Sequence, residues 1–362
     1  MGLRSGTAYV DVTDPVHPTY LGKLPLKRNA KSIWADIKVF GNYAFIVSES
    51  PAQGMQILDL TQLRDITEPR VLEATEEYMG ITSSHNIFIN EDTGFAYLVG
   101  TKTCEGGKSS SVSHHILSLL YSYTSNSNRK YAGLHMVDIN DPLNPAFAGC
   151  YSTDGYTHDV QCVIYRGPDT EHVGKEICFA SNEDTVTIVD VSDKTNPILI
   201  SRTGYASAEY THQGWLTEDQ KYFIFNDELD ERGRSIPTTT YVVDVSDLDN
   251  VGTVKKYEAA TRAIDHNLYT RGEYVFEANY RAGLRILKIN DMASANFTEV
   301  GVFDIYPQDD NNQFNGAWSN FPYFASGNVI ISGIEQGLYV VRPNFDLSSP
   351  PRPSMLEDDV NQ

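Results

Sequence analysis

One short pattern recurs along the whole chain: an apolar strand that ends in Asp and continues into a polar turn, often with Pro. Clear copies are YVDVTDP at residues 9–15, IVDVSD at 188–193 and VVDVSD at 242–247. The matching positions of seven copies are Asp11, Asp59, Asp138, Asp190, Asp244, Lys288 and Arg342. Successive gaps are 48, 79, 52, 54, 44 and 54 residues, so five of the six lie near fifty. A fixed period of this length indicates a repeat architecture.

Each copy belongs to a larger unit of four short strands. A strand that follows a His or Trp motif comes first, and an aromatic-rich strand such as residues 43–47 or 95–99 comes second. The Asp-ending strand is third, and a further strand such as residues 298–303 is fourth. Four strands per unit at this period is typical of a β-propeller blade. We therefore expect an all-β fold, a seven-bladed β-propeller of four-stranded blades over residues 1–345.

The expected first and third strands differ in number, and the difference lies at the N-terminus. The chain has seven third strands but only six starts of first strands, at Trp34, His85, His158, His212, His266 and Trp318. Because the chain begins directly at a third strand, we expect the first blade to be truncated at the N-terminus. Residues 346–362 are rich in Pro, Ser and Asp, and we expect them to form a disordered tail.

The 79-residue gap contains a segment that fits no strand of the repeat. Residues 108–133 are rich in Ser and Tyr, and without these 26 residues the gap returns to 53. We expect an inserted surface loop, or translated non-coding sequence from an imperfect gene model. In either case His114 and His115 are not counted as site residues.

Charge and hydropathy exclude two classes of partner. The net charge of −20 gives an acidic surface that repels phosphate backbones, so we expect no nucleic-acid partner. No apolar run reaches the roughly 18 residues of a membrane helix, so we expect no membrane span in this chain. The first residues also lack the apolar core of a signal peptide.

The four cysteines lie within one stretch of the chain, and none forms a CxxC pair. Cys162 and Cys178 flank a turn-rich segment and would face each other across a hairpin. We expect disulfides Cys162–Cys178 and Cys104–Cys150, which would place the protein outside the cytosol. Free buried thiols remain the alternative.

Four histidines share one local setting, because each begins an innermost strand of its blade. In a propeller such residues point toward one mouth of the central channel. The candidate ligand-binding residues at this mouth are Trp34, Asp36, His85, His158, Asp159, His212, Asp265, His266 and Trp318. Imidazole and carboxylate are good ligands for divalent metals, so His85, His158, His212 and His266 are candidate metal ligands.

Three roles for these histidines stay open. One His per blade is typical of a structural device, such as the His of WD repeats that bonds within its own blade. The same residues could hold a zinc or calcium ion, or take part in catalysis. A catalytic site normally breaks repeat symmetry, because its groups need different pKa values, so a structural role is favoured.

An acidic run, Asp227-Glu228-Leu229-Asp230-Glu231, follows the second strand of one blade. Carboxylates on such a turn could hold Ca²⁺, but a solvated acidic loop is the favoured interpretation. Glu49 and Glu183 occupy the same place in earlier blades. The sequence contains no GxSxG, HExxH, P-loop or GxGxxG motif, which favours a protein that is not an enzyme.

The sequence also resembles a known family. Its VDVSD strands are similar to the LVIVD repeat, and longer phrases resemble the "choice-of-anchor B" family of secreted or surface-anchored proteins. Such phrases include GLHMVDINDPLNPAFAGCYSTDGYTHDVQC, EICFASNEDTVTIVDVSDK and SGNVIISGIEQGLYVVRPN. The resemblance covers about residues 6–345, apart from residues 108–133. It implies a propeller, an extracellular or cell-surface location, and a further pair of strands and a signal peptide upstream.

These observations lead to one expected function and one alternative. We expect a secreted or cell-surface scaffold that binds a protein or carbohydrate ligand at a propeller face. The alternative is a metal-binding protein or metal-dependent enzyme that uses the channel-mouth histidines. The resemblance implies fold and compartment, and no reaction.

Overall fold

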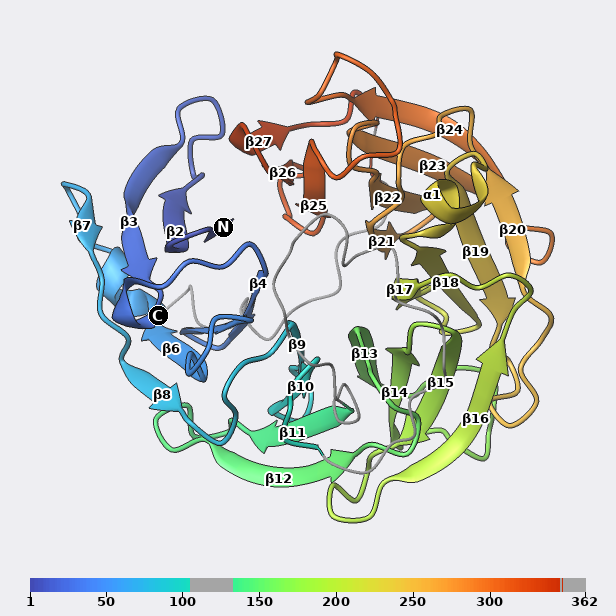
Figure 1. Ribbon diagram of the computed structural model, residues 1–362, viewed down its shortest axis with the longest axis horizontal. Coiled ribbons are helices and arrows are strands. Elements are labelled where there is room, and N and C mark those ends of the chain that lie inside the picture. The colour runs from blue at the N-terminus through green and yellow to red at the C-terminus, as the bar shows by residue number, and fades with distance from the viewer. Residues whose placement is uncertain (105–132, 346, 348–362) are drawn as a thin grey trace.

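The computed structural model describes residues 1–104, 133–345 and 347. Short strands form seven sheets, almost entirely antiparallel, that are arranged as blades in a ring around a common axis, as Figure 1 shows. Six of these sheets have four strands and one has three in the described residues. The fold class predicted from the repeat period, a seven-bladed β-propeller, is confirmed.

The first two blades share one connection. Blade 1 contains, in sheet order, β1 (Gly2–Leu3), β2 (Gly6–Asp11), β3 (Thr19–Pro25) and β7 (Arg70–Val71). Blade 2 contains β4 (Ala35–Phe40), β5 (Tyr43–Ser48), β6 (Met55–Asp59) and β8 (Glu76–Tyr78). Two short 3₁₀ helices, η1 (Lys27–Asn29) and η2 (Leu60–Leu63), lie in the connections. Since β7 belongs to the segment between β6 and β8, blade 2 supplies the outer edge of blade 1.

The next four blades follow the repeat closely. Blade 3 contains β9 (Asn86–Asn90), β10 (Phe95–Val99), β11 (Leu134–Asp138) and β12 (Ala146–Tyr151). Blade 4 contains β13 (Asp159–Ile164), β14 (Glu176–Ser181), β15 (Thr185–Asp190) and β16 (Ile198–Gly204). Blade 5 contains β17 (Thr211–Leu216), β18 (Tyr222–Asp227), β19 (Thr239–Asp244) and β20 (Lys255–Glu258), with α1 (Asp230–Arg234) between β18 and β19. Blade 6 contains β21 (Asn267–Arg271), β22 (Tyr274–Ala278), β23 (Leu284–Asp291) and β24 (Asn296–Phe303).

The two ends of the chain lie in blades 1 and 7. Blade 7 contains β25 (Ala317–Phe321), β26 (Val329–Gly333) and β27 (Gly337–Val341) in the described residues. In blade 1 the strands β2 and β3 match the third and fourth strands of the repeat, and β1 and β7 make up the sheet of four. The structure adds two short strands that the sequence did not predict. β1 pairs with β2, and β7 pairs with β3 in a parallel arrangement.

The recurring Asp has a local structural role at the end of each third strand. The Asp11 carboxylate accepts a hydrogen bond from the backbone N–H of Thr13, two residues on, at 2.8 Å. The other four Asp copies, Asp59, Asp138, Asp190 and Asp244, make the same bond at 2.8–3.0 Å. An Asp that bonds the backbone two residues later stabilises a turn. The Asp therefore ends the strand and starts the turn toward the fourth strand.

The hydrophobic core lies between the blades. Among the described residues, six clusters of buried apolar side chains join successive blades, from blades 1 and 2 to blades 6 and 7. Phe179 of blade 4 and Phe223 of blade 5, for example, stack with ring centroids 5.6 Å apart. Alternation along each strand sends side chains toward both neighbouring blades. Every blade thus depends on its neighbours to bury its apolar side chains.

The structure contains the two predicted disulfides. Cys162 and Cys178 are directly paired across β13 and β14, and their Cα atoms lie 4.0 Å apart. Cys104 and Cys150 form the second bond, with Cα atoms 5.8 Å apart. No cysteine is free.

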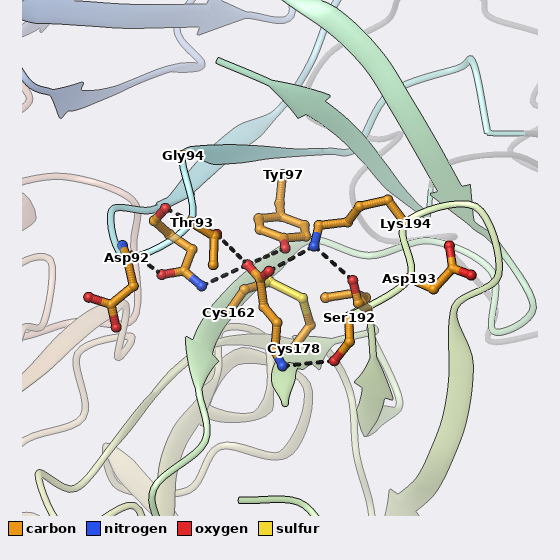
Figure 2. A network of polar contacts seen from close by, with 12 residues as sticks. Asp92, Thr93, Gly94, Tyr97, Cys162, Cys178, Ser192, Asp193 and Lys194 are labelled. Atoms are coloured by element: carbon orange, nitrogen blue, oxygen red, sulfur yellow. Dashed lines mark hydrogen bonds and ion pairs between the residues drawn. A yellow bond between two sulfur atoms is a disulfide. The ribbon is translucent and has the colours of Figure 1, made fainter. Parts of the chain in front are cut away.

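A buried polar network joins blade 3 to blade 4 beside the disulfide Cys162–Cys178, as Figure 2 shows. Glu176 accepts hydrogen bonds from Tyr97 at 2.5 Å and from Thr93 at 2.9 Å, both of blade 3. Lys194 forms an ion pair with the other oxygen of Glu176 at 2.7 Å. The backbone N–H of Glu176 donates to Ser192, on the turn that also carries Lys194.

Two segments singled out in the sequence lie outside the described residues. These are the predicted inserted loop, residues 108–133 apart from Gly133, and the predicted tail, residues 346–362 apart from Leu347. Within the described part of the chain, no helix is both long and apolar enough to cross a membrane.

Candidate functional site

The innermost strand of each blade positions the predicted site residues. In Figure 1 the strands β4, β9, β13, β17, β21 and β25 line the centre of the ring. His85, His158 and His266 each lie directly before one of these strands, and His212 and Trp318 lie one residue inside theirs. The repeat therefore brings the same position of successive blades to one place on the channel.

The four predicted histidines lie next to one another in blade order. The ring centroids of His85 and His158 are 4.3 Å apart, those of His158 and His212 are 4.1 Å apart, and those of His212 and His266 are 4.4 Å apart. Trp34 extends this row beyond His85 at 6.4 Å, and Trp318 extends it beyond His266 at 4.8 Å. We call these six residues the histidine row. It draws one ring from each of blades 2 to 7.

Hydrogen bonds from the imidazoles cross to the next blade. The Nδ1–H of His158 donates to the backbone carbonyl of His212 at 2.9 Å, and that of His266 donates to the backbone carbonyl of Trp318. These two bonds run between blades, unlike the bonds that the His of WD repeats makes within its own blade. A carbonyl can only accept, so these bonds place the proton on Nδ1 and leave Nε2 with its lone pair.

Amides at the adjacent positions reinforce these links. Asn86 donates to the carbonyl of His158 at 3.2 Å, and Asn267 donates to the carbonyl of Trp318 at 2.9 Å. Gln213 makes two bonds to the backbone of Leu268, each 3.0 Å long. The residues that follow His85, His212 and His266 thus tie one inner strand to the next.

Glu228 is the carboxylate that faces the histidine row. Its oxygens lie 3.8 Å from Nε2 of His212 and 3.4 Å from Nε2 of His266. The hydroxyl of Tyr280 donates to Glu228 at 2.6 Å. Ligand atoms of His212, Glu228 and His266 all lie within 4.8 Å of one another. At this spacing the three side chains could bind one metal ion together.

Burial controls the charge of these groups. It lowers the pKa of His266 to about 3, and raises the pKa of Glu228 to about 7 despite the hydrogen bond from Tyr280. Burial also lowers the pKa of His158 and of His212 well below the usual value, and repulsion from neighbouring imidazoles adds to the effect. The imidazoles of His158, His212 and His266 are therefore neutral at pH 7 and offer lone pairs.

A second polar group lies farther along the inner strands. Lys38 forms an ion pair with Asp36 at 2.6 Å, and Asp36 also accepts the backbone N–H of Ile87. Asn86 donates to Asp159 at 3.1 Å. Burial raises the pKa of Asp159 to about 7, while Lys38 opposes the rise. Asp36 and Asp159 thus belong to a lysine-centred group separate from Glu228.

The acidic run at residues 227–231 is buried, so the expectation of a solvated loop is wrong. Asp227, Asp230 and Glu231 are each 0% exposed. Asp227 accepts the hydroxyl of Tyr205, Asp230 that of Tyr241, and Glu231 the backbone N–H of Thr239. Protein donors therefore hold these side chains.

Asp265 belongs with these buried carboxyls rather than with the histidine row. Burial raises its pKa well above the usual value, and repulsion from Glu231, Asp230 and Asp227 raises it further. Neither of its side-chain oxygens has a hydrogen-bond partner in the described residues.

Glu228 and Tyr280 are the site residues that the sequence analysis did not predict. A signal for Glu228 existed, because Glu49 occupies the matching position of blade 2. Glu49 bonds His85 of the next blade at 2.6 Å, as Glu228 faces His266 of the next blade. The carboxylate after a second strand and the His that starts the next blade thus recur as a pair.

A protein-family model, the LVIVD repeat, matches residues 30–60 and 174–203. The chain carries LVIVD repeats. The matched residues include β5 and β6 of blade 2 and β14 and β15 of blade 4, where the Asp-ending third strands lie. Comparison of this LVIVD-repeat propeller with curated proteins finds no match.

Several solved structures share the fold. Hydrazine synthase from Kuenenia stuttgartiensis is similar with a TM-score of 0.59 and 10% identity, over 91% of this chain and 87% of that one. A protein from Lactobacillus plantarum gives 0.55 and 10%, over 95% and 92%. The periplasmic gluconolactonase of Pseudomonas aeruginosa gives 0.51 and 9%, over 82% and 76%. At such low identity these likenesses show the propeller fold alone.

Proposed function

We propose that this LVIVD-repeat propeller is a secreted or cell-surface scaffold that binds a protein or carbohydrate ligand at the channel mouth. The histidine row carries this proposal, because six rings from six successive blades meet at one place. Trp34 at one end is 37% exposed and is available to a ligand. Aromatic rings with a polar edge are common anchors at binding surfaces.

The disulfides and the family similarity support the extracellular part of the proposal. The two disulfides are typical of proteins that fold outside the cytosol. The similarity of long phrases to the "choice-of-anchor B" family supports the same location. In this proposal residues 1–345 are one propeller domain, residues 108–133 are an inserted loop, and residues 346–362 are a tail.

The repetition of one imidazole per blade favours binding over a reaction. A catalytic site normally breaks repeat symmetry, because its groups need different roles. Here four successive blades instead place a His at the start of the inner strand.

The experiment is a screen of the full-length secreted protein on glycan and extracellular-protein arrays, with and without a chelator. Trp34→Ala should abolish binding to any ligand found. Tyr20→Ala is the matched control, because Tyr20 is an aromatic residue of similar exposure, 45%, on the outer strand β3. Equal loss in both variants, or retention in both, would place the ligand elsewhere and contradict the proposal.

A further inference from the structure

Two imidazoles and one carboxylate at the centre of the histidine row converge on a single point. His212 and His266 come from successive inner strands, and Glu228 follows directly after β18 of blade 5. In tetrahedral zinc sites, bonds of about 2.0–2.1 Å place ligand atoms about 3.3 Å apart. Oε1 of Glu228 lies 3.4 Å from Nε2 of His266, and Oε2 lies 3.8 Å from Nε2 of His212, so each oxygen is near this spacing from one imidazole.

We infer that His212, Glu228 and His266 form a binding site for one divalent transition-metal ion, with zinc as the best fit. The inference deepens the proposed function, because the ion would lie in the histidine row and its free coordination position would face the ligand. That last step rests on the proposed function, whereas metal binding itself does not.

The orientation of His266 is suited to metal binding. Its Nδ1–H donates to the carbonyl of Trp318, so Nε2 carries the lone pair and faces Glu228. Metal-bound histidines typically donate their other ring N–H to a carbonyl or carboxylate. The Nδ1 of His212 is buried and has no hydrogen-bond partner in the described residues. No bond at Nδ1 therefore opposes a small rotation of this ring, whose Nε2 already faces Glu228 and which also has a side-chain hydrogen bond with Asn226.

Glu228 is held in place by a residue with an uncommon backbone conformation. Tyr280 donates to Glu228 at 2.6 Å and has a φ of 36° although it is not glycine. Such conformations are costly and are concentrated at functional sites. Tyr280 also lies beside His266, with ring centroids 4.5 Å apart. This hydrogen bond is made to Oε1, which faces His266, and it leaves Oε2, which faces His212, available to an ion.

The charges of the group also call for a cation. Oε1 of Glu228, which accepts the Tyr280 hydroxyl, faces the Nε2 lone pair of His266 at 3.4 Å. In the described part of the chain, no Lys or Arg forms an ion pair with Glu228. Buried charges are normally paired or bound to metals. A divalent ion between the acceptors would turn their repulsion into attraction.

The donor set selects the type of metal. Two imidazole nitrogens and one carboxylate suit zinc and related transition metals, whereas calcium and magnesium require mostly oxygen ligands. Three protein ligands leave one tetrahedral position open. His85 and His158 are not part of this group, so the metal set predicted from the four histidines is replaced by two of them and Glu228.

Another acidic group with a histidine is a weaker candidate. Asp169, His172 and Asp249 also have ligand atoms within 4.8 Å. However, the Lys175 ammonium lies 3.3 Å from Nδ1 of His172 and repels a cation, and Asp249 is largely exposed. A hydrogen bond from the backbone of Leu248 already occupies the Asp169 oxygen.

The test is calorimetric titration of the full chain, stripped with EDTA and with its disulfides intact, with zinc chloride. The wild type should bind one equivalent that raises its melting temperature. Glu228→Gln keeps the shape of the side chain and should weaken binding at least tenfold. Glu49→Gln is the matched control, because it removes the equivalent carboxylate at His85 and should leave zinc affinity within about twofold. Wild-type protein that binds no zinc, or Glu228→Gln protein that binds it normally, would overturn the inference.

A second measurement on the wild type covers the case in which Glu228→Gln does not fold. Cobalt(II) should replace zinc and give hyperfine-shifted imidazole N–H signals from two histidines by NMR. Signals from one histidine or none would also overturn the site. If zinc fails to bind while ligand binding still depends on Trp34, only this inference falls. If zinc binds and no ligand requires Trp34, only the proposed function falls.

Discussion

The ammonium of Lys194 lies 2.7 Å from the carboxylate of Glu176, and both side chains are more than nine-tenths buried. The Lys194 ammonium also donates to the carbonyl of Val191 and lies 4.1 Å from the centroid of the Phe95 ring in blade 3. With the hydroxyl of Tyr97 on the same carboxylate, this pair joins blade 3 to blade 4. Breaking a buried pair leaves an uncompensated charge.

Lys194→Met should therefore lower the free energy of unfolding by about 3–5 kcal/mol. The change keeps the length of the side chain and removes its charge, so the buried carboxylate loses its partner. Lys256→Met is the control, because Lys256 and Glu258 form an exposed pair that contributes about 0–1 kcal/mol. Urea denaturation of both variants measures the difference, and equal midpoints would show that the buried pair is not required.

Gly149 on β12 should not tolerate alanine. A Cβ at this position would lie 1.7 Å from the backbone oxygen of Lys194, so blades 3 and 4 would have to separate. We expect Gly149→Ala to lower the free energy of unfolding by at least about 2 kcal/mol, which is in the range measured for overpacked cores. Gly204→Ala serves as the comparison, since a Cβ there meets its nearest atom at 3.7 Å. Similar melting temperatures for the two variants would contradict the close approach.

The disulfides should contribute strongly to stability. The chain-entropy model gives about 3 kcal/mol for a loop such as that closed by Cys162 and Cys178, which are 16 residues apart. Replacing both residues with alanine should lower the unfolding free energy by about this amount. Thiol titration of the unfolded, unreduced protein should find no free thiol. A count of about two or four free thiols per chain would show that one or both disulfides are not formed.

His135 should make the protein less stable in acid. Burial lowers its pKa from 6.5 to about 4, and its ring nitrogens bond Tyr78 and Thr103. A pKa lowered by folding gives stability that is present above pH 6.5 and is lost as pH falls toward 4. From the size of this pKa shift, the loss in the free energy of unfolding reaches about 3 kcal/mol.

The measurement for His135 is the unfolding free energy of wild type and His135→Gln between pH 8 and pH 4. Burial also lowers the pKa of other histidines, which lose stability in acid in the same direction. The difference between the two proteins therefore isolates the contribution of His135. The variant should lose less stability on acidification than the wild type. Parallel curves would show that His135 does not gain a proton on unfolding.

The fold was predictable because its signals are local and repeated. Asp59 and Asp138 end strands through bonds to the backbone two residues later, so the pattern marks each third strand directly. The position of His158 in the row followed from the same period. The strand β7 was not predictable, because it leaves its own blade to pair with β3.

The parts of the site that the sequence missed depend on contacts between blades. Glu228 belongs to an acidic run that is typical of a solvated loop, yet the end of β18 brings it against His266 of the next blade. Tyr280 adopts a positive φ only because the turn after β22 holds it there. Neither feature has a local pattern. The paired recurrence of Glu49 with His85 was the one usable signal.

The side-chain bonds from Asn86, His158 and Gln213 to the following blade also bear on how this protein comes apart. In linear repeat arrays the units are coupled only to their neighbours, and the ends unfold first. Here the three links span 72, 54 and 55 residues and join successive inner strands. Opening one middle blade would release the strands on both of its sides. We therefore expect inner-strand amides of blades 3 to 6 to exchange with solvent at one common rate, set by global unfolding rather than by local fluctuation.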